Sequence, residues 1–201
     1  MKLRSTLPVF GIPVLLFFLL SCTKTDQLLQ VNENLLKKSN QPAVCIDIDG
    51  NSYKTIKIGN KVWMAENLRV TRYRNGQAIT PVTTTSGWAD LANLDNKAAW
   101  CYYDNNAGND KPYGKLYTWY AVNDTRGIAP KGWHIPTNEE WIQLGNALGG
   151  YSVAGGKMKT TGTIEAGNGL WRAPNTSATN SSGFSAVPAG ERSASGVFDG
   201  K

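Results

Sequence analysis

Ten consecutive residues, Gly132 to Trp141, constrain the fold more than any other part of the chain. They spell Gly-Trp-His-Ile-Pro-Thr-Asn-Glu-Glu-Trp, which is typical of a strand end, a proline turn and the start of a helix. Thr137, followed three residues later by Glu140, forms the pattern of a capping box. We therefore predict a helix that begins after Thr137 and ends at the Gly149-Gly150 pair. Its core-facing residues would be Trp141, Leu144 and Leu148.

The N-terminal residues resemble a bacterial lipoprotein export signal. Lys2 and Arg4 give a positive start, and the apolar run that follows is shorter than the about 20 residues of a membrane span. Leu19-Leu20-Ser21-Cys22 resembles a lipobox, in which the peptidase cuts before a cysteine whose thiol carries the acyl chains. We predict a signal peptide over 1–21 and lipidation at Cys22. The alternative is an ordinary secretory signal with an incidental cysteine.

Composition limits the partners of the exported chain. Removal of 21 residues from 201 leaves 180, enough for one domain with a real core, preceded by a polar flexible tether over 22–43. The formal charge of +6 is scattered along the chain, whereas a nucleic-acid site needs a basic face. We therefore expect no nucleic-acid partner, and expect contact with the membrane through the acyl chains of Cys22.

Two cysteines, Cys45 and Cys101, remain after Cys22. An exported chain with two thiols permits one disulfide, so the pair is a disulfide candidate. The alternative is two buried free thiols, because a bridge requires backbones that approach closely and the sequence does not show this.

Short alternating runs begin at Val44. Ile46 and Ile48 alternate with Asp47 and Asp49 before a turn, and two further runs continue to Met64. This predicts a small meander of antiparallel strands. Later we expect a strand at 100–103 and a short helix at 115–123, whereas segments 76–95 and 104–112 have loop composition.

Residues after Tyr151 are rich in Gly, Ser, Thr and Asn, which predicts loops with short strands. All seven tryptophans lie between Trp63 and Trp171. We expect their rings to be buried and to hold the irregular segments together. The predicted fold class is α+β, with small antiparallel sheets, two short helices and long ordered loops.

Five stretches give the chain a family resemblance. They are Asp47–Thr55, Ile58–Arg69, Tyr113–Ala121, Pro130–Thr137 and Gly183–Pro188. In this order they resemble the Fibrobacter succinogenes major paralogous domain, found in surface proteins of Bacteroidetes and their relatives. The resemblance covers roughly residues 45 to 198, and we assign 44–201 to this domain.

The resemblance implies a C-type-lectin-like fold. Similar domains continue past the Gly-Phe-Ser-Ala segment, so we expect the domain in this chain to be incomplete at its C-terminus. The Ile-Pro-Thr-x-x-Glu-Trp segment also resembles the helix entry of formylglycine-generating enzymes. Those enzymes use a cysteine pair late in the domain, and no cysteine follows Cys101 here, so this activity does not carry over.

A polar loop supplies the candidate ligand-binding residues. Lectin-like folds can bind calcium and sugar through oxygen-rich loops, and aromatic rings can stack on sugars. The candidates are Asp104, Asn106, Asn109 and Asp110, with Tyr103 and Tyr113 as stacking rings. The alternative, a polar surface loop beside core tyrosines, is favoured by the composition. The cofactor that such a loop would suit is calcium.

Other polar residues favour structural roles. The Asp47-x-Asp49-x-Asn51 cluster has Ile58 at its twelfth position instead of a glutamate, so it is no EF-hand loop and indicates a hairpin turn with solvated acids. His134 is the only histidine, which excludes a three-histidine metal site. We expect it to be packed or hydrogen-bonded, and expect Glu140 to cap the helix. No catalytic or metal-binding residue is assigned.

These patterns suggest three functions and name no ligand. The favoured one is a non-catalytic binding module on a surface-anchored lipoprotein, for glycans or for another envelope protein. The alternative is a structural or adhesive envelope component without a small ligand. An enzyme of the formylglycine-generating type is the third. The expected location is the bacterial cell envelope, at the outer membrane or cell surface.

Overall fold

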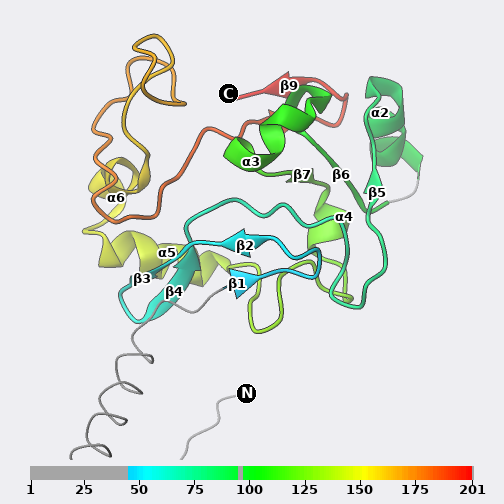
Figure 1. Cartoon of the computed structure of the whole chain (residues 1–201), viewed down its shortest axis with the longest axis horizontal. Helices are drawn as coiled ribbons and strands as arrows, with labels where there is room; N and C mark the ends of the chain where they lie inside the picture. Colours follow the sequence, from blue (N-terminus) through cyan, green and yellow to red (C-terminus); the bar gives the residue numbers. More distant parts are fainter. Residues whose placement is uncertain (1–44, 95–96, 201) are drawn as a thin grey trace, which may run out of the picture. The chain divides into compact units, whose positions relative to one another are not determined.

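A computed structural model describes residues 45–94 and 97–200 (Figure 1). The predicted signal peptide, the lipidation site at Cys22 and the tether lie outside the described residues. The described part contains small sheets and short helices, which confirms the α+β class. Within that part, no helix is long and apolar enough to cross a membrane.

The strands form four small sheets within the described residues. Three are antiparallel pairs, β1 with β2, β3 with β4 and β8 with β9, whereas β6 pairs in parallel with β5 and antiparallel with β7. The strands are β1 (Cys45–Ile46), β2 (Ser52–Tyr53), β3 (Thr55–Ile58), β4 (Lys61–Met64), β5 (Thr80–Pro81), β6 (Ala99–Cys101), β7 (Leu116–Tyr117), β8 (Glu191–Arg192) and β9 (Phe198–Asp199). The predicted meander is therefore two separate hairpins.

The helices are short. They are α2 (Thr85–Leu94), α3 (Asp110–Tyr113), α4 (Trp119–Val122), α5 (Asn138–Ala147) and α6 (Tyr151–Met158), with 3-10 turns η1 (Tyr103–Asn105) and η2 (Ala107–Asn109). Figure 1 shows α5 and α6 next to the β3–β4 hairpin. Leu144 of α5 and Leu148, which directly follows the helix, are buried there against Ile58 and Trp63.

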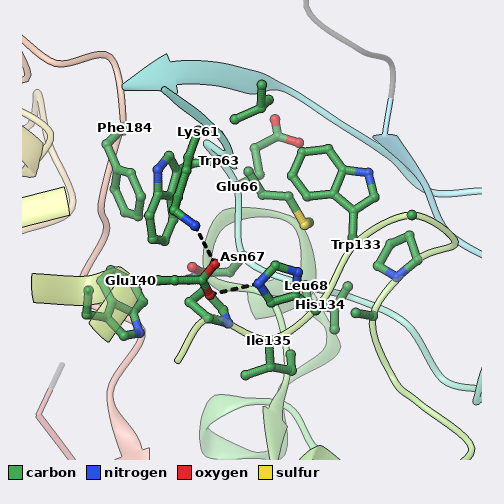
Figure 2. A pocket seen from close by; sticks show the side chains of 17 residues that line it. Lys61, Trp63, Glu66, Asn67, Leu68, Trp133, His134, Ile135, Glu140 and Phe184 are labelled. Atoms are coloured by element: carbon green, nitrogen blue, oxygen red, sulfur yellow. Dashed lines mark hydrogen bonds and ion pairs between the residues drawn. The ribbon is translucent and has the colours of Figure 1, made fainter. Parts of the chain in front are cut away.

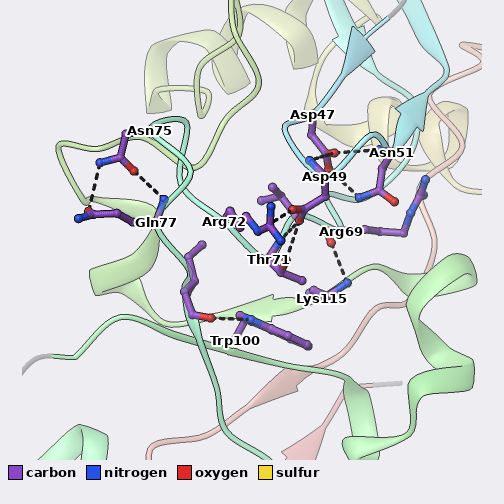
Figure 3. A network of polar contacts seen from close by, with 12 residues as sticks. Asp47, Asp49, Asn51, Arg69, Thr71, Arg72, Asn75, Gln77, Trp100 and Lys115 are labelled. Carbon is purple, nitrogen blue, oxygen red and sulfur yellow. Dashed lines mark hydrogen bonds and ion pairs between the residues drawn. The ribbon is translucent and has the colours of Figure 1, made fainter.

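The hairpin of β1 and β2 reverses the predicted burial. Asp47 is 6% exposed, whereas Ile46 and Ile48 are exposed. The Asp47 carboxylate accepts hydrogen bonds from the backbone N–H groups of Asp49 and Asn51, from the Asn51 side chain, and from the Tyr53 hydroxyl (Figure 3). These donors offset the cost of burying the charge. The expectation of solvated acids was therefore wrong for Asp47.

Asp49 also makes contacts that stabilise the fold. Its Oδ2 accepts from the Thr71 hydroxyl at 2.8 Å and from the Thr71 backbone N–H, and its Oδ1 lies 3.6 Å from Arg72 Nε (Figure 3). These contacts join the turn between β1 and β2 to the segment that follows Val70. The turn itself was predicted correctly.

Segments predicted as loops contain helices. The Thr84 hydroxyl, directly before α2, accepts from the Gly87 backbone N–H, and Trp88 of α2 is buried. A cap and one aromatic anchor therefore stabilise this helix. Segment 104–112 holds η1, η2 and most of α3. The chain after Tyr151 begins with α6 instead of a loop.

Segment 115–123 is only half helical. Leu116 pairs with Cys101 in the β6–β7 ladder, and α4 begins after Thr118, whose hydroxyl accepts from the Ala121 backbone N–H. Trp119, whose ring we expected to be buried, is exposed, and so is its neighbour Tyr120. Strand pairing across the sheet therefore overrides the local helical pattern.

Tryptophan burial is also mixed. Trp63, Trp88 and Trp100 are buried in three different clusters, which confirms the expected role for these rings. Trp119 and Trp141 are exposed, contrary to expectation.

A buried arginine joins strand β8 to segment 82–105. Arg192 of β8 is 9% exposed, and its guanidinium donates to the backbone oxygens of Val82, Thr84 and Gly196 and to Asn105 Oδ1. The same group lies 4.7 Å from the centroid of the Trp88 ring and 4.6 Å from that of Phe198. Carbonyl dipoles and aromatic faces therefore balance its charge.

Candidate functional site

A cavity of about 520 Å³ lies beside the start of α5. Its walls come from β4 and the residues after it, from segment 129–136, from the first turn of α5, and from Phe184 (Figure 2). These elements include the Gly-Trp-His-Ile-Pro stretch that the sequence singled out. The volume lies within the range of about 300–1,000 Å³ that is typical of small-molecule sites.

Aromatic rings form much of the wall. Trp63, Trp141 and Phe184 contact one another, with ring centroids 5.3 Å apart for the two tryptophans and 6.2 Å from each to Phe184. Trp63 is buried beneath, whereas Trp141 is 45% exposed. Figure 2 shows Trp133 across the pocket from Trp63 and Phe184. The wall therefore presents apolar ring surface that stays accessible to solvent.

Glu140 stands at the centre of the polar contacts. Its Oε1 lies 2.7 Å from Lys61 Nζ, and its Oε2 lies 2.7 Å from His134 Nε2 (Figure 2). The Oε2 atom also accepts from the Thr137 backbone N–H at 3.0 Å. The Lys61 ammonium, the Thr137 amide and His134 lower the pKa of Glu140 to about 2. The carboxylate is therefore ionised at neutral pH.

The ionised carboxylate fixes the proton on the histidine. A carboxylate only accepts, so His134 Nε2 must carry the hydrogen and donate it to Glu140. The side chain of His134 is 67% exposed, and its other ring nitrogen remains outside this pair. Lys61 has three N–H donors, of which the bond to Glu140 uses one. The Lys61 ammonium and the His134 imidazole can therefore each form a further hydrogen bond next to the aromatic wall of the pocket.

Local sequence explains how these groups meet. Glu140 is the third residue of α5, where the capping box holds it: Thr137 Oγ1 accepts from the Glu140 backbone N–H at 3.2 Å, as predicted. Lys61 opens β4 directly after the tight Gly59-Asn60 turn of the hairpin. Packing of Trp63 against Leu144 and Leu148 brings hairpin and helix together. His134 is hydrogen-bonded, as expected, but is not buried.

The residues of the predicted polar loop make contacts within the domain. Asn106 accepts from the Gly108 backbone N–H, Asn109 donates to the Tyr103 carbonyl, and Asp110 pairs with Lys115. Asp104 is exposed, with a φ of 54°. Three of the four predicted oxygen ligands therefore stabilise the loop itself. Among residues 45–94 and 97–200, no group of three or more His, Cys, Asp or Glu side chains is arranged to hold a metal.

The predicted stacking tyrosines are buried. Tyr103 packs against Phe198 with ring centroids 5.3 Å apart, and Tyr113 is enclosed near Asn67, whose side chain donates to the Tyr113 carbonyl. Neither ring offers a face to a sugar. The alternative of core tyrosines was correct.

The candidate disulfide is absent. Cys45 and Cys101 are both buried free thiols. Burial, and then the nearby Asp47 charge, raise the pKa of Cys45 to about 11, and burial raises that of Cys101. The alternative prediction, two buried free thiols, was therefore correct.

The pocket residues were only partly visible in the sequence. The local pattern predicts Trp141 as a core residue and Glu140 as a helix cap, and it indicates no site role for Lys61 or Trp133. A signal was nevertheless present, because stretches 58–69, 130–137 and 183–188, on which the resemblance rests, each contribute residues to this one pocket.

Comparison with known proteins supports that resemblance. The family model of the Fibrobacter succinogenes major domain matches residues 56–201, which include every residue that lines the pocket. No curated protein and no solved structure matches the chain. A match over more than half of the chain shows that this protein belongs to the Fibrobacter succinogenes major domain family.

Proposed function

We propose that this protein is a non-catalytic binding module and that the aromatic pocket takes a sugar ring of a glycan. The observation that carries the proposal is the exposed face of Trp141 beside a hydrogen-bonded Lys61–Glu140–His134 group. A pyranose ring has a C–H face that packs on aromatic carbon and a rim of hydroxyls that need donors and acceptors. The pocket supplies both kinds of surface.

Preorganisation favours binding at this site. Glu140 already accepts from three donors, so the polar group is held rigid before any ligand arrives. Trp141 is likewise held against Trp63 and Phe184. A ligand therefore meets fixed groups and loses little free energy to ordering side chains of the protein.

The electrostatics favour binding over catalysis. A carboxylate with a pKa of about 2 has no proton to give at neutral pH, so Glu140 is unsuited to act as a general acid. Chemistry of the formylglycine-generating type needs reactive thiolates. Cys45 and Cys101 are buried with raised pKa values, which disfavours their thiolate forms.

The proposed location follows from the N-terminal sequence. We propose that acyl chains on Cys22 hold the protein at the outer membrane or cell surface, where it would meet glycans. The proposed lectin-like relationship of the domain fits this function, although fold alone does not assign a ligand.

A second candidate is an adhesive envelope component without a small ligand. The observation in its favour is Trp119 of α4, whose side chain is highly exposed but does not line the aromatic pocket. A large exposed ring outside a cavity is the kind of residue that anchors protein–protein contacts.

The two candidates are separated by a glycan array followed by calorimetry on the best-binding oligosaccharide. We expect Trp141→Ala to weaken binding about tenfold or more, equivalent to about 1.4 kcal/mol. Trp119→Ala is the matched control, since it removes an exposed indole elsewhere, and should bind like the wild type. Circular dichroism would confirm that both variants fold. Binding to envelope extracts that depends on Trp119, without any glycan binding, would favour the adhesive role instead.

A further inference from the structure

A second, smaller cavity of about 250 Å³ borders the aromatic pocket. Ala129 and Pro130 line both cavities, so this buried segment forms a shared wall. The small cavity is otherwise enclosed by the start of the β1–β2 hairpin, by Val70 and the residues after it, and by Ile128 and Lys131. The exposed Ile46 and Ile48 add to the apolar lining that Val70, Ile128, Ala129 and Pro130 provide.

Most of the charged residues that line the small cavity are basic, although its surface is largely apolar. Arg72, Arg74 and Lys131 line it, and the one carboxylate in the lining is Asp47. That carboxylate is buried and already accepts four hydrogen bonds from its own hairpin, so it offers little to a cation in the cavity. The aromatic pocket is different, because its one lysine, Lys61, is paired with the Glu140 carboxylate and Glu66 also lines the pocket.

The three cations are held to different degrees. Arg74 is braced, since its Nε donates to the Ala129 carbonyl at 3.1 Å and its Nη2 to the Trp133 carbonyl at 3.4 Å. Arg72 is more than half exposed, and its Nε lies 3.6 Å from Asp49 Oδ1, which Figure 3 shows. Lys131 is exposed next to Pro130. One braced arginine and two exposed basic side chains therefore line part of a small, largely apolar space.

We propose that this cavity is a second subsite of the same binding surface and that it takes the anionic group of an acidic glycan. The proposal rests on the proposed function: one sugar ring would stack in the aromatic pocket while a neighbouring ring places a carboxylate or sulfate against Arg72, Arg74 and Lys131. A guanidinium group binds carboxylate or sulfate oxygens through paired N–H donors. Neutral sugar hydroxyls do not require positively charged partners, so the three basic side chains favour an anionic group.

Because Arg74 bonds to the backbone of Trp133, the two subsites are mechanically linked. The braced guanidinium holds the segment that carries one ring of the aromatic pocket. The two subsites would therefore be held at a fixed separation before a ligand binds. Such an arrangement favours oligosaccharides, which can occupy both subsites, over monosaccharides.

The test compares ligands that differ only in charge. Calorimetry at low salt would use trigalacturonate against its methyl ester, and a sulfated galactan oligosaccharide against its desulfated form. We expect the wild type to bind at least one acidic member about tenfold or more tightly than its neutral partner. The preference should shrink as salt is added, because the cations are partly exposed. Which pair shows the preference identifies carboxylate or sulfate as the anion.

The variant Arg72→Gln/Lys131→Gln should lose the preference for the acidic ligand while it binds the neutral partner like the wild type. Arg74 is left intact because it braces the backbone. Lys111→Gln/Arg172→Gln is the matched control, since it removes two exposed positive charges outside both cavities and should keep the preference.

Equal binding of the acidic and neutral members in both pairs would overturn the second subsite and leave the aromatic pocket standing. A preference that survives in Arg72→Gln/Lys131→Gln would also overturn it. Absence of binding by any oligosaccharide, or binding unaffected by Trp141→Ala, would contradict the proposed function itself.

Discussion

Replacement of Arg192 by alanine should destabilise the domain more than any surface change. Arg192 donates four hydrogen bonds at 3.0–3.3 Å, three of them to backbone carbonyls, and its guanidinium lies between Trp88 and Phe198. Its loss would leave these partly buried carbonyls without their donor and would open a cavity between the two rings.

The expected loss of stability is the balance of lost contacts and a removed desolvation cost. A hydrogen bond to a charged group contributes about 1.5–3 kcal/mol, and a desolvated cation–π contact about 2 kcal/mol. Their simple sum overstates the effect, because removal of the guanidinium also removes the cost of burying its charge. We therefore expect Arg192→Ala to lower the free energy of unfolding by about 4 kcal/mol, in the range found for broken buried charge networks.

The assay is urea unfolding followed by circular dichroism, with thermal unfolding as a second measure. For a domain of this size, about 4 kcal/mol corresponds to a fall in melting temperature of roughly 10 °C. Arg192→Lys should lie between alanine and wild type, since it keeps the charge but not the planar donor fork. Arg172→Ala, an exposed control, should change stability by less than about 0.5 kcal/mol. Equal stabilities of Arg192→Ala and Arg172→Ala would refute the reasoning.

Three further predictions concern other parts of the fold. Glu140 has a lowered pKa of about 2, so its ion pairs stabilise the folded state above about pH 4.5 and lose this effect as the pH falls towards 2. Urea unfolding should show wild type more stable than Glu140→Gln at pH 7, with the difference shrinking between pH 4.5 and 2.5; a constant difference would contradict this. Gly114→Ala should cost about 3 kcal/mol in chemical unfolding, because φ is +74° and a Cβ would lie 2.7 Å from Asn67 Cβ; unchanged stability would show that the backbone adjusts freely. Iodoacetamide should modify Cys45 and Cys101 only after denaturation, as mass spectrometry would show; a mass that rises only after reduction and alkylation together would instead indicate a disulfide.

Features fixed by neighbouring residues were predictable from the sequence. The capping box at Thr137 and Glu140 needs only a threonine and a glutamate three residues apart, and the structure contains both of its hydrogen bonds. The turn after β1 was equally visible. Its burial pattern was not, because Asp47 becomes buried through the Tyr53 hydroxyl, a donor six residues away that alternation does not take into account.

Features that depend on distant partners were not predictable. The pair of Lys61 and Glu140 joins residues 79 positions apart, and the bond from Arg192 to the Val82 carbonyl spans 110. No local pattern identifies such partners. The same reason explains the error at Trp141. Its spacing is that of a core residue, but although Trp63 and Phe184 contact its ring, Trp141 stays exposed and lines the pocket.

The central claim is that a sugar ring occupies the aromatic pocket. Its most direct test is nuclear magnetic resonance of the seven tryptophan indole N–H groups during titration with the best-binding oligosaccharide of the array. We predict that the signals of Trp133 and Trp141 shift in a saturable manner, while those of the buried Trp88 and the exposed Trp119 stay in place. Saturable binding that moves Trp119 and leaves Trp133 and Trp141 unchanged would contradict the account.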